Sequence, residues 1–335
     1  MPSITSAVNK HPANHDQIQA AAIALRRGEL IGIPTETVYG LGADARNEQA
    51  IKKIFTLKNR PLDHPLIVHI ASITQLQEWA IDISPNAYQL AAQFWPGPMT
   101  LILKRHPSVS TMISGGQATI GIRIPSHPVA QQLLTQFASG IAAPSANRFG
   151  HISPTRAAHV RAEFDQLQLP IILDGGDSEV GIESTIIDCS TPVIRILRPG
   201  KITRAQIEKV IGKIAENTPA PSPRVSGSLD SHYAPTTPAL LLSRSELVAR
   251  GKRLTADNLS FSVLAICSVP PMCQGIALAN EPNSYAHELY AALRTLDDMQ
   301  KDFILIEAPP KQSPWLAVQD RLQRAAKAQS AEHGQ

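Results

Sequence analysis

A short basic segment, Lys58-Asn59-Arg60-Pro61, is the first place where residue type and spacing suggest chemistry. Proline disfavours the helical conformation in the residue before it, so Arg60 is expected to be extended. In an extended segment residues i and i+2 point the same way, which predicts that Lys58 and Arg60 project together and clamp a phosphate. An isolated basic loop is more simply a solvated surface. This one, however, leads from a predicted helix into an apolar strand, where ligand sites of α/β proteins gather.

Two predicted strands each carry one ionisable side chain in an otherwise largely apolar run. His69 lies near the carboxyl end of the run 66–70, where a structural histidine, considered alone, is the favoured explanation. Arg123 lies in the alternating run 118–124, on the same face as Gly121. A buried arginine needs a negative partner, and both a protein carboxylate and a substrate carboxylate satisfy that need.

Small and hydroxyl-bearing residues form a third group. Residues 142–146 are small enough to let a ligand approach the backbone. Ser153-Pro154 has the form of a helix N-cap followed by proline, predicting a helix to about residue 164 whose N-terminus attracts anions. Ordinary capping explains the same pattern without a ligand. The turn 181–185 and Arg198 at a strand end are weaker candidates of the same kind.

Several familiar motifs are missing. The sequence has no Gly-x-x-x-x-Gly-Lys-[Ser/Thr] loop, no metal-ligand spacing and no nucleophile elbow. Residues 40–45 match the dinucleotide fingerprint only loosely, because the acidic residue about 20 positions on would be Asp63, which is not at a strand end. The candidates together therefore predict a site that binds and positions anions.

The elements that must position these residues are predicted strands and helices that alternate along the chain. They lie before and after a segment rich in proline and serine, 216–238. That composition is typical of a linker. We expect an α/β catalytic domain over 1–213, a linker over 214–237 and a second α/β domain over 238–335.

Composition limits the class of protein. The net charge is +3, and residues 1–215 hold 20 basic and 16 acidic side chains. This excess suits a small polyanion such as a nucleotide, and with 4% aromatic residues it argues against a nucleic-acid-binding surface. Three cysteines without a Cys-x-x-Cys pair favour a reducing compartment. No apolar run approaches membrane-spanning length, so we expect a cytoplasmic protein without membrane contact.

Taken in order, these segments resemble one family, the YrdC/Sua5 group of L-threonylcarbamoyladenylate synthases. The resemblance covers roughly residues 16–212, and the linker ending at Pro235 and the α/β tail are similar to the longer, Sua5-type members. The motifs that carry it are Pro34-Thr35-Glu36-Thr37-Val38-Tyr39-Gly40-Leu41-Gly42, Lys58-Asn59-Arg60-Pro61, Pro65-Leu66-Ile67-Val68-His69, Phe94-Trp95-Pro96-Gly97-Pro98-Met99-Thr100, Ile122-Arg123-Ile124-Pro125, Ala143-Pro144-Ser145-Ala146-Asn147, Leu197-Arg198-Pro199-Gly200 and His232-Tyr233-Ala234-Pro235.

The resemblance implies a fold and a reaction. The fold is a twisted, open, mixed sheet with flanking helices, followed by a smaller Rossmann-like α/β domain. The reaction joins L-threonine, bicarbonate and ATP into threonylcarbamoyladenylate and pyrophosphate, with Mg²⁺ accompanying the ATP. The product passes to the machinery that transfers the threonylcarbamoyl group to adenosine 37 of tRNA.

The resemblance also implies roles for individual residues. The catalytic pair is Lys58 and Arg60. The nucleotide-binding residues are Arg60, His64, Thr119, Ser145, Ser153, Arg198 and Tyr233. The threonine-binding residues are Thr37, His69, Arg123, Ala143 and Ser184. His64 stands where the family commonly has asparagine, and Val225-Ser226-Gly227 stands where Pro-Gly is more usual.

Two alternative functions remain open. One is a factor that forms carbamoyl-adenylate for metal-site maturation, although such proteins carry zinc-finger cysteines that this sequence lacks. The other is an RNA-binding module without catalysis, for which the excess positive charge before residue 216 leaves a weak tRNA contact open.

Overall fold

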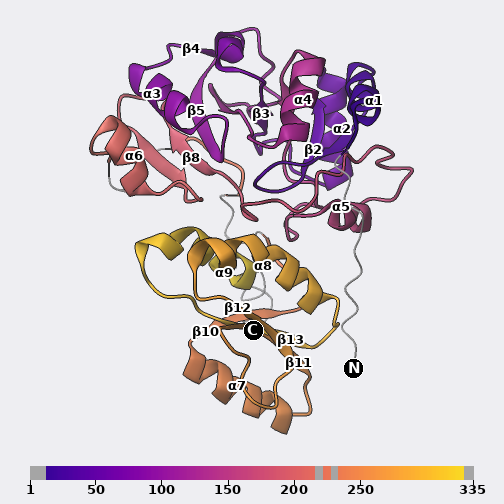
Figure 1. The fold of residues 1–335 in the computed structure, drawn as a ribbon, viewed down its shortest axis with the longest axis vertical. Helices are drawn as coiled ribbons and strands as arrows, with labels where there is room; N and C mark the ends of the chain where they lie inside the picture. Colours follow the sequence, from indigo (N-terminus) through magenta and orange to yellow (C-terminus); the bar gives the residue numbers. More distant parts are fainter. Residues whose placement is uncertain (1–12, 216–221, 228–232, 328–335) are drawn as a thin grey trace.

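The computed structural model describes residues 13–215, 222–227 and 233–327. Figure 1 shows two bodies, each built around its own β-sheet. The α/β class predicted for both halves is confirmed. The predicted boundaries at residues 213 and 238 fall between the last helix before the linker and the first strand after it, and residues 216–221 and 228–232 of the predicted linker lie outside the described part.

The larger sheet is mixed and has the strand order β1-β2-β7-β3-β6-β5-β8-β9, with β4 paired to β5. The pairs β3–β6 and β5–β8 are parallel, and the other pairs are antiparallel. Its strands are β1 (Ile31–Ile33), β2 (Gly40–Asp44), β3 (Ile67–His69), β4 (Ala80–Ile81), β5 (Met99–Arg105), β6 (Thr119–Arg123), β7 (Ile141–Ala142), β8 (Thr185–Asp188) and β9 (Arg195–Arg198).

Helices flank this sheet, and several begin at the caps that the sequence predicts. The Asn47 side chain accepts from the first backbone N–H groups of its helix, and Thr203 and Gln206 form the predicted capping box. The helices are α1 (His15–Arg26), α2 (Glu48–Lys58), α3 (Pro85–Phe94), α4 (Pro128–Phe137), α5 (Ala157–Glu163) and α6 (Arg204–Ile211), with the 3₁₀ helix η1 (Ile73–Glu78).

The smaller sheet is entirely parallel, with the order β10-β13-β11-β12. Figure 1 shows α7 on the face away from the larger body, and α8 and α9 on the face toward it. The elements are β10 (Ala239–Leu242), α7 (Arg244–Ala256), β11 (Phe261–Ile266), β12 (Gly275–Leu278), α8 (Pro282–Asp297), β13 (Phe303–Glu307), η2 (Ser313–Trp315) and α9 (Leu316–Lys327).

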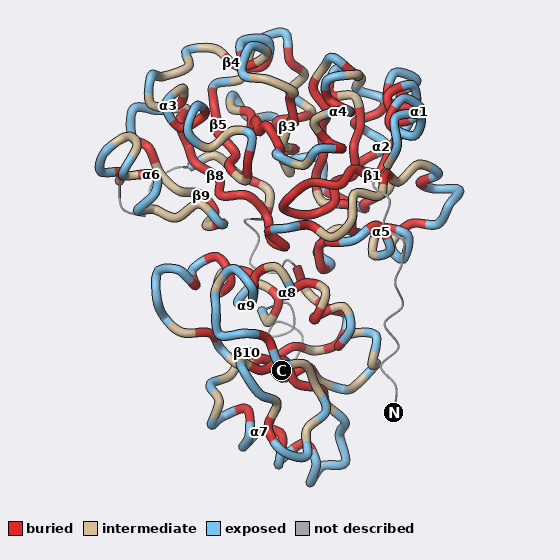
Figure 2. Tube along the Cα trace, in the orientation of Figure 1, coloured by how far each residue is buried: buried red, intermediate tan, exposed pale blue. Residues whose placement is uncertain are grey.

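One hydrophobic cluster crosses from the smaller body into the larger one. Val38, Ile152 and Ile182 pack in the same buried cluster as Leu289 and Leu293 of α8. In Figure 2 buried chain lies on both sides of the boundary between the bodies. The α8–α9 layer is therefore covered on one side by its own sheet and on the other by the larger body.

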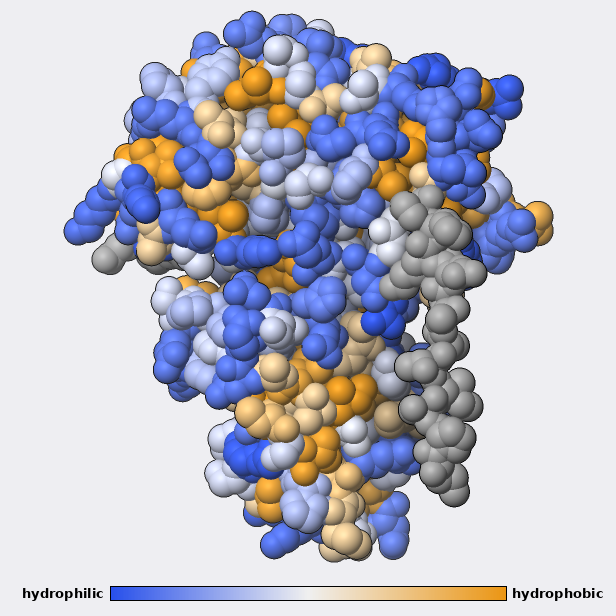
Figure 3. All heavy atoms as spheres, in the orientation of Figure 1, coloured by the Kyte–Doolittle hydropathy of each residue, from blue (hydrophilic) through white to orange (hydrophobic). Residues whose placement is uncertain are grey.

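The outer surface is more polar. The face drawn in Figure 3 is covered mainly by hydrophilic residues, with smaller apolar areas between them. None of the helices in the described ranges is both long and apolar enough to cross a membrane.

Three elements differ from what the sequence patterns predict. The pattern over 74–81 predicts one helix, but the structure has the shorter η1 followed by β4. The apolar run 171–174 predicts a strand, but the structure has only a bridge between Gly32 and Ile172. Ser153 does not cap a helix, because α5 starts at Ala157 after Arg156. The Ser153 hydroxyl instead donates to the Glu183 carboxylate at 2.6 Å, a stronger, charged acceptor that the local sequence pattern does not include.

We predict that replacing Leu289 by alanine lowers the free energy of unfolding by about 2–5 kcal/mol, because its side chain is fully buried in the cluster that joins the bodies. Chemical denaturation measures the change. The exposed neighbour Glu288→Ala is the control and should change stability by less than about 0.5 kcal/mol. Equal effects of the two variants would contradict the packing described here.

Candidate functional site

A closed cleft at the carboxyl ends of parallel strands gathers most of the predicted residues. His69 and Arg123 are register partners at the last positions of β3 and β6, so their side chains start side by side. The cleft holds a cavity of about 50 Å³. Nine of the thirteen predicted site residues line it: Thr37, Arg60, His69, Arg123, Ala143, Ser145, Ser184, Arg198 and Tyr233.

Arg123 occupies one end of the cleft and is buried. Its Nη2 lies 2.6 Å from the Glu36 carboxylate, Nη1 donates to the Thr37 hydroxyl at 2.8 Å, and Nε donates to the Gly97 carbonyl at 3.2 Å. Of the two partners that the sequence leaves open, the protein carboxylate is therefore present. A guanidinium has five N–H donors, so one hydrogen on each terminal nitrogen remains without a partner in the described ranges.

Burial and this ion pair shift the pKa values of the ionisable groups beside Arg123. Burial acts to raise the pKa of Glu36, but the charge and hydrogen bond of Arg123 outweigh it and hold the pKa below its usual value. Burial, followed by repulsion from Arg123, lowers the pKa of His69 to about 3, so its imidazole is neutral at physiological pH. His69 Nδ1 is buried without a hydrogen-bond partner among the described residues. The end of the cleft thus combines a neutral ring with a cation.

Two further arginines form the other side of the cleft. Arg60 donates to the Pro65 carbonyl at 2.9 Å and lies over the Phe149 ring at 5.5 Å. Arg198 donates to the Ser184 carbonyl through Nε and Nη2 at 3.1 and 2.9 Å. Burial lowers the pKa of Arg60 to about 10, which still leaves it charged at neutral pH. Two ionised guanidiniums facing one small space can hold phosphate oxygens.

Lys58 does not project into the cleft with Arg60. The helix α2 continues through Lys58, and Asn59 is left-handed, so the expected extended geometry is wrong. The Lys58 amino group donates to the Ser145 carbonyl at 2.6 Å and to the Asn147 carbonyl. Burial, followed by repulsion from Arg60, holds its pKa well below the usual value. Lys58 therefore contacts the back of the loop that carries Ser145.

Three predicted nucleotide residues also lie outside the lining. His64 packs edge-to-face on Phe149 at 5.1 Å, behind Arg60. Thr119 borders a separate small cavity of about 10 Å³. Ser153 is fully buried and reaches the cleft only through its bond to Glu183. In this closed conformation these three residues support the wall or lie beside it.

Glu183 is the wall residue that the sequence reasoning missed. Its carboxylate accepts from Ser153 Oγ at 2.6 Å, from Tyr290 Oη at 2.9 Å and from Arg321 Nε at 2.7 Å. Burial acts to raise its pKa, but Arg321 and then Arg198 outweigh this and hold it at about 2. Tyr290 and Arg321 belong to the smaller body, more than a hundred positions along the chain. No local motif indicates such a partnership.

Residues of the predicted linker close the cleft. Ser226, Gly227 and Tyr233 are part of its lining. Arg60 donates to the Ser226 hydroxyl at 3.2 Å, and Arg198 donates to the Ser226 carbonyl at 2.9 Å. A cavity of about 50 Å³ is far smaller than the roughly 300–1,000 Å³ of typical ligand pockets. A ligand of nucleotide size therefore requires these residues to move outward.

We predict that Glu183→Gln is destabilising at neutral pH and that the difference from the native chain shrinks in acid. The folded pKa of about 2 lies below the ordinary value of 4.5, so the ionised carboxylate adds stability above pH 4.5, on the order of 3 kcal/mol, that is lost as pH falls toward 2. Unfolding free energies from pH 7 down to pH 3 measure this. Glu179→Gln, at an exposed position, is the control. A difference that does not vary with pH would contradict the buried ion pair.

Comparisons with known proteins match both bodies of the chain. A Sua5/YciO/YrdC family model, described as telomere recombination, matches residues 23–200. A second model, described as the C-terminal domain of threonylcarbamoyl-AMP synthase, matches residues 202–327. The chain is 39% identical to threonylcarbamoyl-AMP synthase from Bacillus subtilis, covering 93% of this chain and 94% of that protein. It is 38% identical to the protein of the same name from Pyrococcus abyssi, covering 92% and 94%.

A solved structure is similar over both bodies. The crystal structure of P. abyssi Sua5 complexed with L-threonine has a TM-score of 0.85 and 38% identity, covering 92% of this chain and 94% of that chain. The likeness extends across the larger mixed sheet and the smaller parallel sheet together.

Proposed function

The chain belongs to the Sua5/YciO/YrdC family, and we propose that it forms L-threonylcarbamoyladenylate from L-threonine, bicarbonate and ATP with release of pyrophosphate. It is then a nucleotidyltransferase that acts in tRNA modification. Its product would be consumed by the enzymes that transfer the threonylcarbamoyl group to tRNA, and we propose that it acts in the cytoplasm.

The observation that carries the proposal is the division of one cleft into two chemically different ends. At one end, Arg123 keeps free donors beside the neutral ring of His69, which suits an amino-acid carboxylate. At the other end, Arg60 and Arg198 remain cationic where a triphosphate would lie. Both ends open into the same cavity, so the two substrates would be held next to each other.

We propose that the chain catalyses the reaction mainly by positioning and electrostatics. A carbamate formed from the threonine amine and bicarbonate with loss of water would attack the α-phosphate in line, and pyrophosphate would leave. Arg60 and Arg198 would stabilise the negative charge that develops on the phosphate oxygens. Closure by Ser226, Gly227 and Tyr233 would keep water away from the reacting groups.

Magnesium is proposed as part of the ATP substrate. Mg²⁺ usually keeps several waters and is held through one or two carboxylates together with substrate phosphates. Within the described ranges no three His, Cys, Asp or Glu side chains gather as a metal site. The Glu183 carboxylate in the lining already accepts three hydrogen bonds. The donor set therefore fits phosphates better than a metal held by the protein alone.

Lys58 is proposed to act through the loop that it supports. Its amino group binds the Ser145 and Asn147 carbonyls, which fixes the backbone of a residue that lines the nucleotide end. It would thus orient Ser145 without touching the substrate. His64 would act in a similar way, because it packs on the ring beneath the Arg60 guanidinium.

The direct test measures pyrophosphate released from Mg-ATP with bicarbonate, with and without L-threonine. We expect release that depends on threonine. Release without threonine would point to the carbamoyl-adenylate alternative. No release, together with binding of tRNA, would favour the RNA-binding alternative and overturn the proposal.

We predict that Arg123→Ala raises the KM for threonine by about 10- to 100-fold, because it removes charged hydrogen bonds, and changes the KM for ATP much less. Steady-state kinetics of pyrophosphate release with each substrate varied in turn measures both constants. Arg46→Ala is the control, because Arg46 is half-exposed and pairs with Glu78 at the surface. Equal losses for threonine and ATP would show that Arg123 only maintains the fold.

A further inference from the structure

We propose that Arg321 of the smaller body, assisted by Tyr290, is a positioning residue for the nucleotide end of the cleft. Arg321 lies on α9, and its side chain is completely buried against the wall of the larger body. The inference rests on the proposed function, because it concerns the pocket assigned to ATP. Under this proposal, residues of the smaller body determine the geometry of that pocket.

The Arg321 guanidinium contacts both segments of the wall. Nε donates to the Glu183 carboxylate at 2.7 Å, and Nη2 donates to the Glu183 carbonyl at 3.3 Å. Nη1 donates to the Pro199 carbonyl at 3.1 Å. Glu183 directly precedes Ser184, and Pro199 directly follows Arg198. The single Arg321 guanidinium therefore holds the backbone at Glu183 and at Pro199, which flank the contact between Ser184 and Arg198.

The same side chain also supports the linker. The Arg321 guanidinium lies over the Tyr233 ring at 5.3 Å, and the Tyr290 ring lies 5.8 Å from Tyr233. Tyr290 Oη donates to the same Glu183 carboxylate. Arg321 and Tyr290 therefore support Tyr233 and Glu183, both of which line the cleft, although neither of the two is itself in the lining.

A second ion pair between the bodies lacks these connections. Arg294 of α8 lies 2.8 Å from Glu163 of α5 and donates to the Ile152 carbonyl. None of these three residues lines the cleft. Arg294 is thus a matched control: it is partly buried and bridges the same two bodies, and its hydrogen bonds and ion pair within the described ranges go to Glu163 and Ile152, which are not in the lining.

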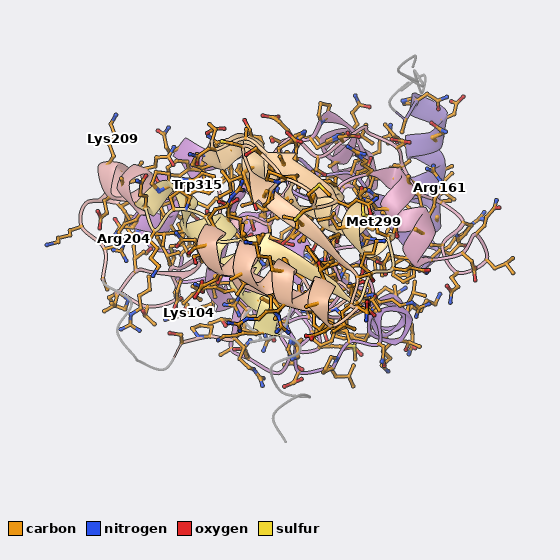
Figure 4. The ribbon with its side chains drawn as sticks, turned by 90° about the horizontal axis from the view of Figure 1, so that it is seen from below. Lys104, Arg161, Arg204, Lys209, Met299 and Trp315 are labelled. Atoms are coloured by element: carbon orange, nitrogen blue, oxygen red, sulfur yellow. The ribbon has the colours of Figure 1, made fainter. Side chains whose placement is uncertain are left out.

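A groove of about 840 Å³ lies elsewhere along the boundary between the bodies and shares no lining residue with the cleft. Arg204 of the larger body and Trp315 of the smaller body, both labelled in Figure 4, belong to its lining. Arg321, Tyr290 and Glu183 are absent from its lining. Of the residues that Arg321 contacts, Pro199 borders this groove, whereas Glu183 and Tyr233 line the cleft.

The experiment compares Arg321→Lys, Tyr290→Phe and the control Arg294→Lys in the full chain. Each variant is assayed for threonine-dependent pyrophosphate release, with ATP and threonine varied in turn, and for thermal unfolding. We expect Arg321→Lys to raise the KM for ATP by about 10- to 100-fold, more than the KM for threonine, because the lysine cannot hold Glu183 and Pro199 together. Tyr290→Phe should cause a smaller change in the same direction.

Arg294→Lys should lower thermal stability while leaving the KM for ATP unchanged. The proposal is overturned if Arg321→Lys lowers stability without changing the KM for ATP, or if both KM values rise equally. If Arg321→Lys does not fold, an unchanged KM for ATP in Tyr290→Phe overturns it instead. Failure of the native chain to release pyrophosphate would reject the proposed function, a result distinct from either of these.

Discussion

A buried carboxylate must be paired, and the pairing of Glu183 organises the site. Its oxygens accept from one hydroxyl of the larger body and from two groups of the smaller body. Removing a charged side chain from water is costly, and only good geometry with full hydrogen bonding offsets that cost. The satisfied pair therefore ties the orientation of Ser184, Arg198 and Tyr233 to the way the two bodies pack. A hydrophobic cluster across the same boundary supports the pair.

The cleft itself concentrates cations. Arg60, Arg123 and Arg198 are all buried and line one small cavity, yet among the residues that the structure describes only Arg123 is paired directly with a carboxylate. The other two are held mainly by carbonyl oxygens and by Ser226. Carbonyls orient a guanidinium without neutralising it, so the positive potential remains available to an anion. This arrangement explains why the site suits phosphates and a carboxylate and needs little covalent chemistry from the protein.

Local patterns predicted the parts of the site that depend on local geometry. His69 and Arg123 each lie near the end of a strand that the sequence predicts. Only the parallel pairing of β3 with β6, which the sequence did not indicate, brings them side by side. The caps at Asn47 and Thr203 depend on residues within one helical turn and were readable from the sequence. Lys58 was misplaced because a proline two positions after Asn59 does not stop α2 from continuing through Lys58.

The sequence by itself determined the α/β class, most of the helices and strands in their order, the ordered motifs that mark the family, and nine of the residues that line the cleft. The tertiary structure alone decided which partners the charged and hydroxyl side chains have. Ser153 donates to Glu183 instead of capping a helix, Lys58 donates to two backbone carbonyls, and Arg321 contacts Glu183 of the other body. The physical reason is that a backbone conformation depends mostly on near neighbours, whereas a buried polar group takes whichever partner the packing brings to it from anywhere in the chain.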